Sequence, residues 1–408
     1  MKNLILEADR CFMCKKPKCS SFCPISTPVP EVVGLFKEGL IAKAGEILFK
    51  NNPLSLVCSI VCPHDEQCKG NCIRGIKSEP VSFCEIEEHI SKYYLENVRL
   101  EKEDFKEESV AIIGGGPAGI TIAFILAQKG YKVTIFESKS KIGGVMRYGI
   151  PEFRLPNSII DIYEDRLIEL GVKIRPNTLI GPVLTLDKLF DDGYKAIFIG
   201  TGVWNPRTLN IKGESRGNVH YAIDYLKSPE TYKLGETVTV IGAGDVAMDA
   251  ARSAKRNGAK KVYVMYRGSI DTITATRPEY EGAIADGIEF IFQKTPVELL
   301  EEGVKYMVTD GPYGEISDEE NAEVGVFKSD SIIVAISQLP KNNIVSNTTG
   351  VETNSSGLIV TDGNGNTTRS GVFASGDVVS GAKTVVRAVA HAKTVAEEIE
   401  KYIESLNK

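Results

Sequence analysis

The sequence has no cysteine after Cys84, although it runs for 408 residues. The later part therefore lacks any Cys-x-x-Cys pair, which argues against a reductase that works through a mobile disulfide. No apolar run approaches the roughly 18 residues of a membrane span, so no span is expected. The first ten residues include Glu7 and Asp9 and lack the apolar core of a secretory signal. A cytoplasmic protein is the resulting expectation.

Positive charge is in slight deficit. The chain has 48 lysines and arginines against 54 aspartates and glutamates, a formal net charge of -6. This balance argues against nucleic acid as the main partner. The length allows about two or three domains that each bury a core.

All nine cysteines lie between positions 11 and 84. They form two runs and one isolated residue: Cys11, Cys14, Cys19 and Cys23-Pro24; Cys58, Cys62-Pro63, Cys68 and Cys72; and Cys84. In a reducing compartment such clustered cysteines are metal ligands more often than disulfides.

The spacing of the two runs favours two 4Fe-4S clusters. Structural zinc usually takes two close pairs of ligands, whereas bacterial ferredoxin runs end in a Cys-Pro whose cysteine ligates the other cluster. By this logic Cys23 serves the second cluster, and one cysteine of the second run returns to the first. Zinc or four disulfides are the alternatives. His64 is a further candidate ligand, while Cys58 and Cys84 are alternatively buried thiols without a metal role.

A first nucleotide-binding unit begins after the charged stretch Glu101–Glu108, which is typical of a linker. Strand Ser109–Ile113 leads into Gly114-x-Gly116-Pro117-x-Gly119, a helix and strand Lys132–Glu137. The glycines permit a tight turn, approach of a pyrophosphate and close helix packing. Glu137 is expected to accept hydrogen bonds from ribose hydroxyls. This unit could hold either FAD or NAD.

Gly376-Asp377 favours FAD in that unit. Asp377 follows the expected short strand Val372–Ala374 and precedes the start of the last helix. An aspartate there can bind the ribityl chain, while the helix N-terminus faces the pyrimidine edge of the flavin. The FAD domain is then discontinuous in sequence. A simple Gly-Asp turn is the alternative.

A second unit runs from strand Thr237–Ile241 through Gly242-x-Gly244-x-x-Ala247 to strand Lys261–Tyr266. No acid ends this strand, and Arg267 follows it. An arginine can pair with a 2'-phosphate, so NADPH is favoured and NADH is the alternative. Arg277 is a weaker second candidate, and Arg267 is alternatively a solvated surface charge.

The expected fold is α/β: a helical N-terminal iron-sulfur domain followed by two Rossmann-like nucleotide-binding domains. The expected domains are 1–105 with two 4Fe-4S clusters, 106–230 with 335–408 for FAD, and 231–334 for NAD(P)H. The stretch Val32–Phe49 is expected to be helical, as is Ile86–Asn97.

The order of these parts resembles the small-subunit family of glutamate synthase. That family also includes the large subunit of the ferredoxin:NADP oxidoreductase of anaerobes and the N-terminal half of dihydropyrimidine dehydrogenase. The most specific stretches are Cys62–His64, Gly143–Pro156, Gly200–Gly202, Gly242–Asp249 and Gly376–Lys393.

The resemblance implies a ligand set. One cluster would take Cys11, Cys14, Cys19 and Cys72, and the other Cys23, Cys62, Cys68 and Glu87. Cys58 is then left without iron, and Cys84 competes with Glu87. The matched motifs further place Pro117, Gly144, Arg154, Thr201, Gly202 and Thr384 at the FAD, and Asp245 at the nicotinamide cofactor. NADPH-using members commonly carry two basic residues where this chain has Arg267-Gly268, which weakens the NADPH expectation.

The sequence thus predicts an oxidoreductase that moves electrons between NADPH or NADH, FAD, two 4Fe-4S clusters and a protein partner in a hetero-oligomer. No catalytic acid or base is expected, because a hydride passes directly from nicotinamide to flavin. One alternative is a glutamate synthase small subunit that supplies a separate large subunit. Another is a non-catalytic redox-sensing or structural protein.

Overall fold

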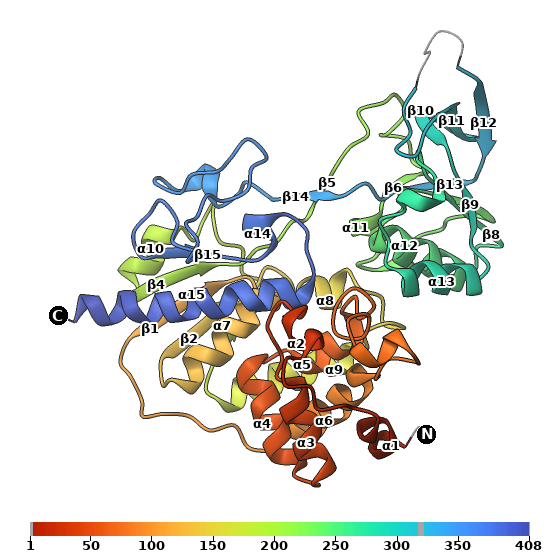
Figure 1. Ribbon diagram of the computed structural model, residues 1–408. Coiled ribbons are helices and arrows are strands. Elements are labelled where there is room, and N and C mark those ends of the chain that lie inside the picture. The colour runs from red at the N-terminus through yellow and green to blue at the C-terminus, as the bar shows by residue number, and fades with distance from the viewer. Residues whose placement is uncertain (1–2, 317–321, 408) are drawn as a thin grey trace. The chain divides into compact units, whose positions relative to one another are not determined.

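The computed structural model describes residues 3–316 and 322–407, and the chain divides into two compact units (Figure 1). The first unit comprises Met1–Arg147, Glu152–Val203 and Pro340–Lys408, and the second Tyr148–Pro151 and Trp204–Leu339. Among the described residues, no helix is both long and apolar enough to cross a membrane.

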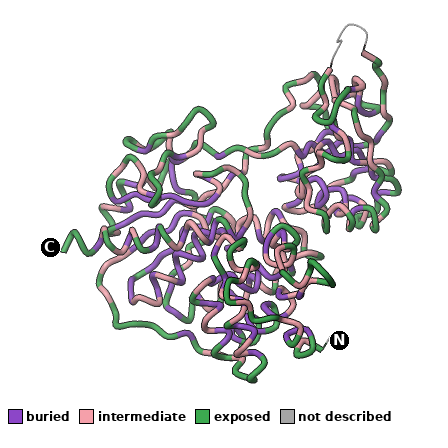
Figure 2. Tube along the Cα trace, viewed as in Figure 1, coloured by how far each residue is buried: buried purple, intermediate pink, exposed green. Residues whose placement is uncertain are grey.

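The N-terminal part of the first unit is a helical bundle with cysteine-bearing loops. Its elements are α1 (Leu4–Asp9), α2 (Lys18–Ser21), α3 (Val29–Lys37), α4 (Ile41–Asn51), α5 (Ser55–Val61), η1 (Ile73–Ile76) and α6 (Phe83–Asn97). Its core is apolar: Val32, Leu48, Ile86 and Ile90 are fully buried (Figure 2). The expected single helical stretch Val32–Phe49 is wrong, because Gly39 has a φ of 76° and separates α3 from α4.

The first nucleotide-binding sheet is parallel throughout, with strand order β15-β4-β1-β2-β3. The strands are β1 (Ser109–Ile113), β2 (Lys132–Phe136), β3 (Lys173–Arg175), β4 (Tyr194–Ile199) and β15 (Val372–Ala374). Its helices are α7 (Pro117–Gln128), α8 (Val145–Tyr148), α9 (Asn157–Glu169), α10 (Leu186–Asp191), α14 (Asp377–Ser380) and α15 (Val385–Leu406). Since β15 and α15 come from the end of the chain, this domain is discontinuous, as expected.

The helical bundle packs directly on this sheet's helices within the first unit. Phe49 of α4 meets Phe124 of α7 edge to face, with ring centroids 5.3 Å apart. Lys393 Nζ of α15 donates a hydrogen bond to the carbonyl oxygen of Asn51 at 2.7 Å, and Arg166 of α9 donates to the carbonyl of Leu95. The expected domain boundary near residue 105 therefore does not separate two compact units.

The second unit contains another parallel sheet, ordered β6-β13-β7-β8-β9. Its strands are β6 (Val219–Tyr221), β7 (Thr237–Ile241), β8 (Lys261–Met265), β9 (Glu289–Ile291) and β13 (Ser331–Val334), with α11 (Ala222–Tyr225), α12 (Asp245–Arg256) and α13 (Arg277–Ala285). A three-stranded antiparallel sheet follows: β10 (Lys294–Leu300), β11 (Gly303–Val308) and β12 (Val324–Lys328).

This unit begins earlier in the sequence than the expected residue 231. Strand β6 pairs with β13, so residues before 231 complete the second sheet. The two connecting segments also pair with each other, through β5 (Asn205–Pro206) and β14 (Gln338–Leu339). These pairings set the unit at Trp204–Leu339 where 231–334 was expected.

Candidate functional site

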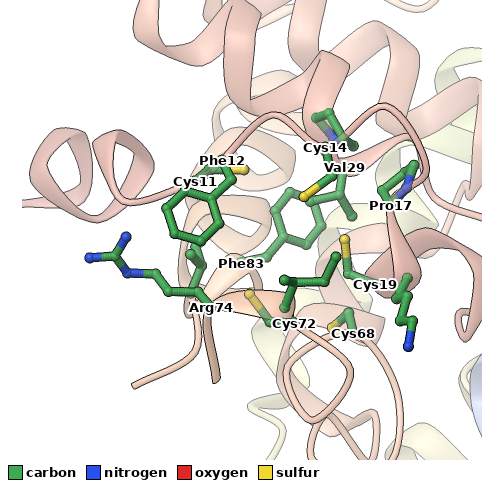
Figure 3. Close-up of a pocket in the computed structure, with 14 residues that line it drawn as sticks. Cys11, Phe12, Cys14, Pro17, Cys19, Val29, Cys68, Cys72, Arg74 and Phe83 are labelled. Atoms are coloured by element: carbon green, nitrogen blue, oxygen red, sulfur yellow. The ribbon is translucent and has the colours of Figure 1, made fainter. Parts of the chain in front are cut away.

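A cavity in the helical bundle brings the first cysteine group together. Five cysteines line it: Cys11, Cys14, Cys19, Cys68 and Cys72 (Figure 3). Burial raises the pKa of Cys11, and it raises the pKa of Cys19 to about 11, with a smaller contribution from Cys72. A buried thiol keeps its proton when no positive charge lies beside it. Bound iron supplies such a charge and allows the cysteines to ionise and act as ligands. The donor set fits a cluster.

A second group gathers around Cys68. Burial raises the pKa of this thiol, and the neighbouring Glu87, Cys84 and Cys23 raise it further. Cys62 belongs to the same neighbourhood, since its pKa is raised first by a hydrogen bond with Cys58, then by burial, and in lesser part by Glu87 and Cys68.

The arrangement of the two groups is crossed. Cys23 of the first run lies near Cys68, and Cys72 of the second run lies near Cys11 and Cys19. No trio of His, Cys, Asp or Glu within residues 3–316 and 322–407 is placed to hold a single metal ion. A four-iron cluster spreads its ligands over several irons, so its cysteines need not converge on one point.

Three side chains are candidates for the fourth ligand of the second cluster. Glu87 of α6 is nearly fully buried, and burial raises its pKa well above the ordinary value. Cys84 precedes it by one helical turn, and Cys58 is buried beside Cys62. His64 is engaged differently, because its Nε2 lies 3.2 Å from the carbonyl oxygen of Cys58.

Glycines shape a cradle at the carboxyl edge of the first sheet. Gly114 has a φ of 101°, and a β-carbon there would lie 2.6 Å from the carbonyl oxygen of Gly200. A β-carbon on Gly119 would lie 2.0 Å from the carbonyl oxygen of Gly114. Gly144 faces Gly116 so closely that its β-carbon would come within 2.7 Å of the Gly116 Cα. The backbone is thus open at the N-terminus of α7, where free N–H groups favour a pyrophosphate.

Glu137 sits at the end of β2, as expected, and its carboxylate already holds two backbone groups. The N–H of Gly115 donates to Oε2 at 2.8 Å, and the N–H of Lys139 donates to Oε1 at 2.8 Å. Each carboxylate oxygen can accept more than one hydrogen bond, so ribose hydroxyls can still be bound.

The loop between β15 and α15 faces the same edge of the sheet. Gly376 has a φ of 76°, and burial raises the pKa of Asp377 to about 6. The N–H of Lys383 donates to Asp377 Oδ1 at 3.2 Å. Thr384 occupies the N-cap position of α15 without a side-chain capping bond. Its buried Oγ1 has no hydrogen-bond partner among the described residues. A glycine cradle, a half-buried carboxyl and an unsatisfied hydroxyl fit a flavin nucleotide.

The other residues expected at the FAD are placed as follows. Thr201 and Gly202 follow β4, and Gly202 has a φ of 68°. Pro117 is the first residue of α7, where its missing N–H costs nothing. Arg154 is half-buried in the loop before α9 and has interactions of its own.

The second unit repeats the strand–glycine–helix arrangement. Gly242 has a φ of 127°, and a β-carbon there would lie 2.3 Å from the carbonyl oxygen of Ala335. Gly244 caps α12, and Ala247 is fully buried within that helix. Asp245 Oδ1 accepts hydrogen bonds from the N–H and hydroxyl of Thr276 at 2.7 and 3.1 Å. This aspartate ties down the loop before α13.

The two arginines expected at the nicotinamide cofactor are both exposed. Arg267 lies just beyond β8, and its carbonyl accepts a hydrogen bond from the Thr309 hydroxyl. Arg277 opens α13 and forms an ion pair with Glu281 at 2.7 Å. Arg267 lies at the strand end where a 2'-phosphate would be read, whereas Arg277 lies farther along the chain.

Sequence reasoning missed two glycines of the first cradle. Gly115 donates its N–H to Glu137, and a β-carbon there would lie 2.7 Å from Ile142. Gly143 has a φ of 130° and donates its N–H to the Gly115 carbonyl at 2.7 Å. The sequence does contain a signal for these two residues, namely the consecutive glycines Gly114–Gly116 and Gly143–Gly144. Each glycine in these runs lies against a different neighbouring group.

The chain matches two family models. The model described as pyridine nucleotide-disulphide oxidoreductase matches residues 78–191 and 108–392. The chain belongs to this family. Residues 1–99 match a second model, described as dihydropyrimidine dehydrogenase domain II, 4Fe-4S cluster.

The relatives are similar along nearly the full length. The small chain of glutamate synthase [NADPH] from Escherichia coli is 31% identical over 98% of this chain and 91% of that protein. The NAD-dependent dihydropyrimidine dehydrogenase subunit PreT from Salmonella typhimurium is 31% identical over 98% and 94%. The expected resemblance to the glutamate synthase small-subunit family is confirmed.

Solved structures share the fold. Thioredoxin reductase of T. acidophilum has a TM-score of 0.57 at 22% identity, covering 74% of this chain and 100% of that one. Mycobacterium tuberculosis FprA in complex with NADPH has a TM-score of 0.59 at 16% identity, covering 74% and 86%. The α/β fold class expected from the sequence is confirmed. This pyridine nucleotide-disulphide oxidoreductase is an NAD(P)H-dependent flavoprotein with an N-terminal 4Fe-4S domain for electron transfer.

Proposed function

We propose that this oxidoreductase exchanges electrons between NADPH or NADH and a partner protein through FAD and two 4Fe-4S clusters, in a hetero-oligomer. The main support for this proposal is that both cysteine groups and the glycine cradle for FAD lie in the same compact unit. A bound flavin accepts a hydride from the nicotinamide and passes on single electrons.

The proposed ligands follow the two neighbourhoods. Cys11, Cys14, Cys19 and Cys72 hold the first cluster, and Cys23, Cys62, Cys68 and Glu87 hold the second. Two neighbours of Cys68, Glu87 and Cys23, support this second set. Cys58 then remains a buried thiol that hydrogen-bonds to Cys62.

The chain's own groups bind and orient the nucleotides. The N-terminus of α7 and the glycines at 114, 116, 119 and 144 would receive the FAD pyrophosphate, and Glu137 its ribose. Asp377 and Thr384 would bind the ribityl chain and flavin edge. In the second unit, the N-terminus of α12 with Gly242 and Gly244 would receive the nicotinamide dinucleotide.

The composition of the purified protein tests the cofactor set. Anaerobic purification from the native source should give about eight iron atoms and one FAD per chain, as two four-iron clusters require. Anaerobic NADPH or NADH should bleach the flavin absorbance. Zinc with little iron would contradict the clusters, and a flavin that neither nucleotide bleaches would favour a sensing or structural protein.

Arg267 is proposed to favour NADPH over NADH. Replacing Arg267 with Glu puts a negative charge where the 2'-phosphate would bind, so the KM for NADPH should rise about tenfold or more, with little change for NADH. Steady-state kinetics with both nucleotides measure this, and Arg277→Glu serves as the comparison. Equal effects on both nucleotides would assign Arg267 a structural role.

A second candidate is the small subunit of a glutamate synthase, favoured by the 31% identity to the E. coli small chain. It requires a separate chain for glutamine hydrolysis. Co-purification with a large glutaminase-bearing subunit would decide for it. For either candidate we place the protein in the cytoplasm, because its clustered cysteines suit a reducing compartment.

A further inference from the structure

Tyr163 of α9 carries a buried hydroxyl that the polypeptide leaves unsatisfied. The side chain is fully buried, and its Oη has no hydrogen-bond partner among the residues that the structure describes. Burying a hydroxyl without a partner destabilises the folded protein, so such groups are rare. The position of Tyr163 therefore points to a partner that the polypeptide alone does not supply.

Tyr163 lies where α9 packs on the helices of the second cysteine group (Figure 1). Three residues farther along the same face of α9, Arg166 donates a hydrogen bond to a carbonyl of α6. Helix α6 is tied in turn to α5, because the hydroxyl oxygens of Ser55 and Ser91 are 2.9 Å apart. On the side of α7, Phe124 meets the Tyr163 ring edge to face, with centroids 6.1 Å apart.

The hydroxyl oxygen of Tyr163 lies at the start of α5. The N–H groups of Leu56 and Val57 belong to the first turn of this helix, where a helix supplies no internal acceptor. Burial raises the pKa of Tyr163 most, and these two N–H groups lower it, so they lie beside the oxygen although neither is aligned for a hydrogen bond. The oxygen therefore faces donors, and the hydroxyl hydrogen remains to be donated elsewhere.

The acceptors within reach belong to the second cysteine group. Cys58 and Glu87 both raise the pKa of Tyr163, and they are 3% and 6% exposed. Glu87 is a proposed ligand of the second cluster, and Cys58 hydrogen-bonds to Cys62, another proposed ligand. The Tyr163 hydroxyl therefore faces the place proposed for the second cluster.

We propose that the Tyr163 hydroxyl donates a hydrogen bond to a sulfur or carboxylate oxygen of the second 4Fe-4S cluster and thereby raises the reduction potential of that cluster. This rests on the function proposed above. Reduction adds one electron to the cluster and no proton, and the hydroxyl hydrogen stays on its oxygen. The hydrogen bond strengthens as the acceptor becomes more negative, so it stabilises the reduced cluster. A residue of the FAD domain thus tunes a cluster that the helical bundle holds.

Potentiometric EPR titration of the anaerobic holoprotein tests this role. Tyr163→Phe removes one oxygen atom and keeps the ring. At the wild-type midpoint potential of the second cluster, the ratio of oxidised to reduced cluster should rise about fivefold, equivalent to a fall of about 40 mV for one electron. The first cluster should keep its potential. The signal that survives in Cys72→Ser identifies the second cluster, because Cys72 is a proposed ligand of the first.

A matched control removes the same hydroxyl from another buried tyrosine. Tyr225 of α11 is also fully buried, and its Oη accepts a hydrogen bond from Asn257 Nδ2 at 3.3 Å. Tyr225→Phe should leave the potentials of both clusters unchanged. Iron assay and flavin absorbance check that each variant is intact. If Tyr163→Phe loses iron, 3-fluorotyrosine at position 163 carries the test. Its more acidic hydroxyl is a stronger donor, so the ratio should fall below the wild-type value.

Three results would overturn the role of Tyr163. One is a second-cluster ratio that neither change at position 163 alters. Another is an equal shift in Tyr163→Phe and Tyr225→Phe. The third is a loss of thermal stability in Tyr163→Phe with no change in the ratio, which would assign the hydroxyl to the start of α5. A wild-type protein without cluster signals would instead contradict the proposed function, whereas two signals with an unchanged second cluster contradict the role of Tyr163 alone.

Discussion

At the scale of single residues, the cysteines show what spacing predicts and where it stops. The Cys23-Pro24 signature predicted that Cys23 leaves its own run, and the structure places it near Cys68. The return of Cys72 to the first group is likewise visible in the cavity. Spacing could not choose among Glu87, Cys84 and Cys58, because the fold gathers all three around Cys62 and Cys68.

Cys72 and Cys58 provide a matched pair of substitutions. Cys72→Ser removes a proposed thiolate ligand of the first cluster, so we expect loss of up to four iron atoms and of one cluster EPR signal. Cys58→Ala removes a buried thiol that binds no iron in this assignment, and should keep full iron. Iron assay and EPR measure both. Full iron in Cys72→Ser with loss in Cys58→Ala would reverse the assignment.

Asp377 predicts a pH dependence of FAD binding. Burial raises its pKa to about 6 without the cofactor, so the carboxyl is protonated below that pH. Ribityl hydroxyls donate to the ionised form, so FAD binding should release a proton. The affinity should then rise by up to about tenfold per unit as pH increases from 4 to 6, and level off above it. Fluorescence titration of deflavinated protein measures this. A wild-type profile identical to that of Asp377→Asn would contradict the role.

At the scale of elements, the sequence predicted strands β1, β7 and β15 with their observed bounds. Strands β1 and β7 are followed by Gly114 and Gly242, where a β-carbon would lie within 2.6 Å of a carbonyl oxygen, and β15 is followed by Ser375 and Gly376, whose φ is 76°. The antiparallel sheet β10–β12 was not predicted, because β12 alternates exposed and half-buried residues and lacks a glycine motif. The start of the second unit at Trp204 depends on the pairings of β6 with β13 and of β5 with β14, which local sequence does not reveal.

The contact between α15 and α4 holds the cluster domain against the FAD domain. Lys393 is half-buried, burial lowers its pKa, and its ammonium binds the Asn51 carbonyl at 2.7 Å. Lys393→Met keeps the apolar stem but leaves the end of α4 unpaired. We expect a stability loss of about 1–3 kcal/mol and slower cluster reduction.

Thermal unfolding and stopped-flow absorbance measure these effects. The control is Lys401→Met on the same helix, whose side chain is 69% exposed. Equal changes in both variants would show that the hydrogen bond from Lys393 to Asn51 makes no specific contribution to stability or to cluster reduction.

At the scale of the whole molecule, the chain combines two nucleotide-binding sheets with a cysteine-bearing helical bundle. The bundle and the FAD cradle form one compact unit, and the nicotinamide-binding sheet forms the other. The central claim is therefore that electrons of the nicotinamide nucleotide reach both clusters within this single chain.

Freeze-quench EPR on the anaerobic holoprotein tests that claim most directly. One sample starts oxidised and is mixed with NADPH, and the other starts reduced by dithionite and is mixed with NADP+. Cluster potentials span roughly -700 to +450 mV, so either direction can be the downhill one. The account predicts that both cluster signals change in at least one sample, together with flavin absorbance. Clusters that keep their starting oxidation state in both samples, while the flavin responds, would contradict it.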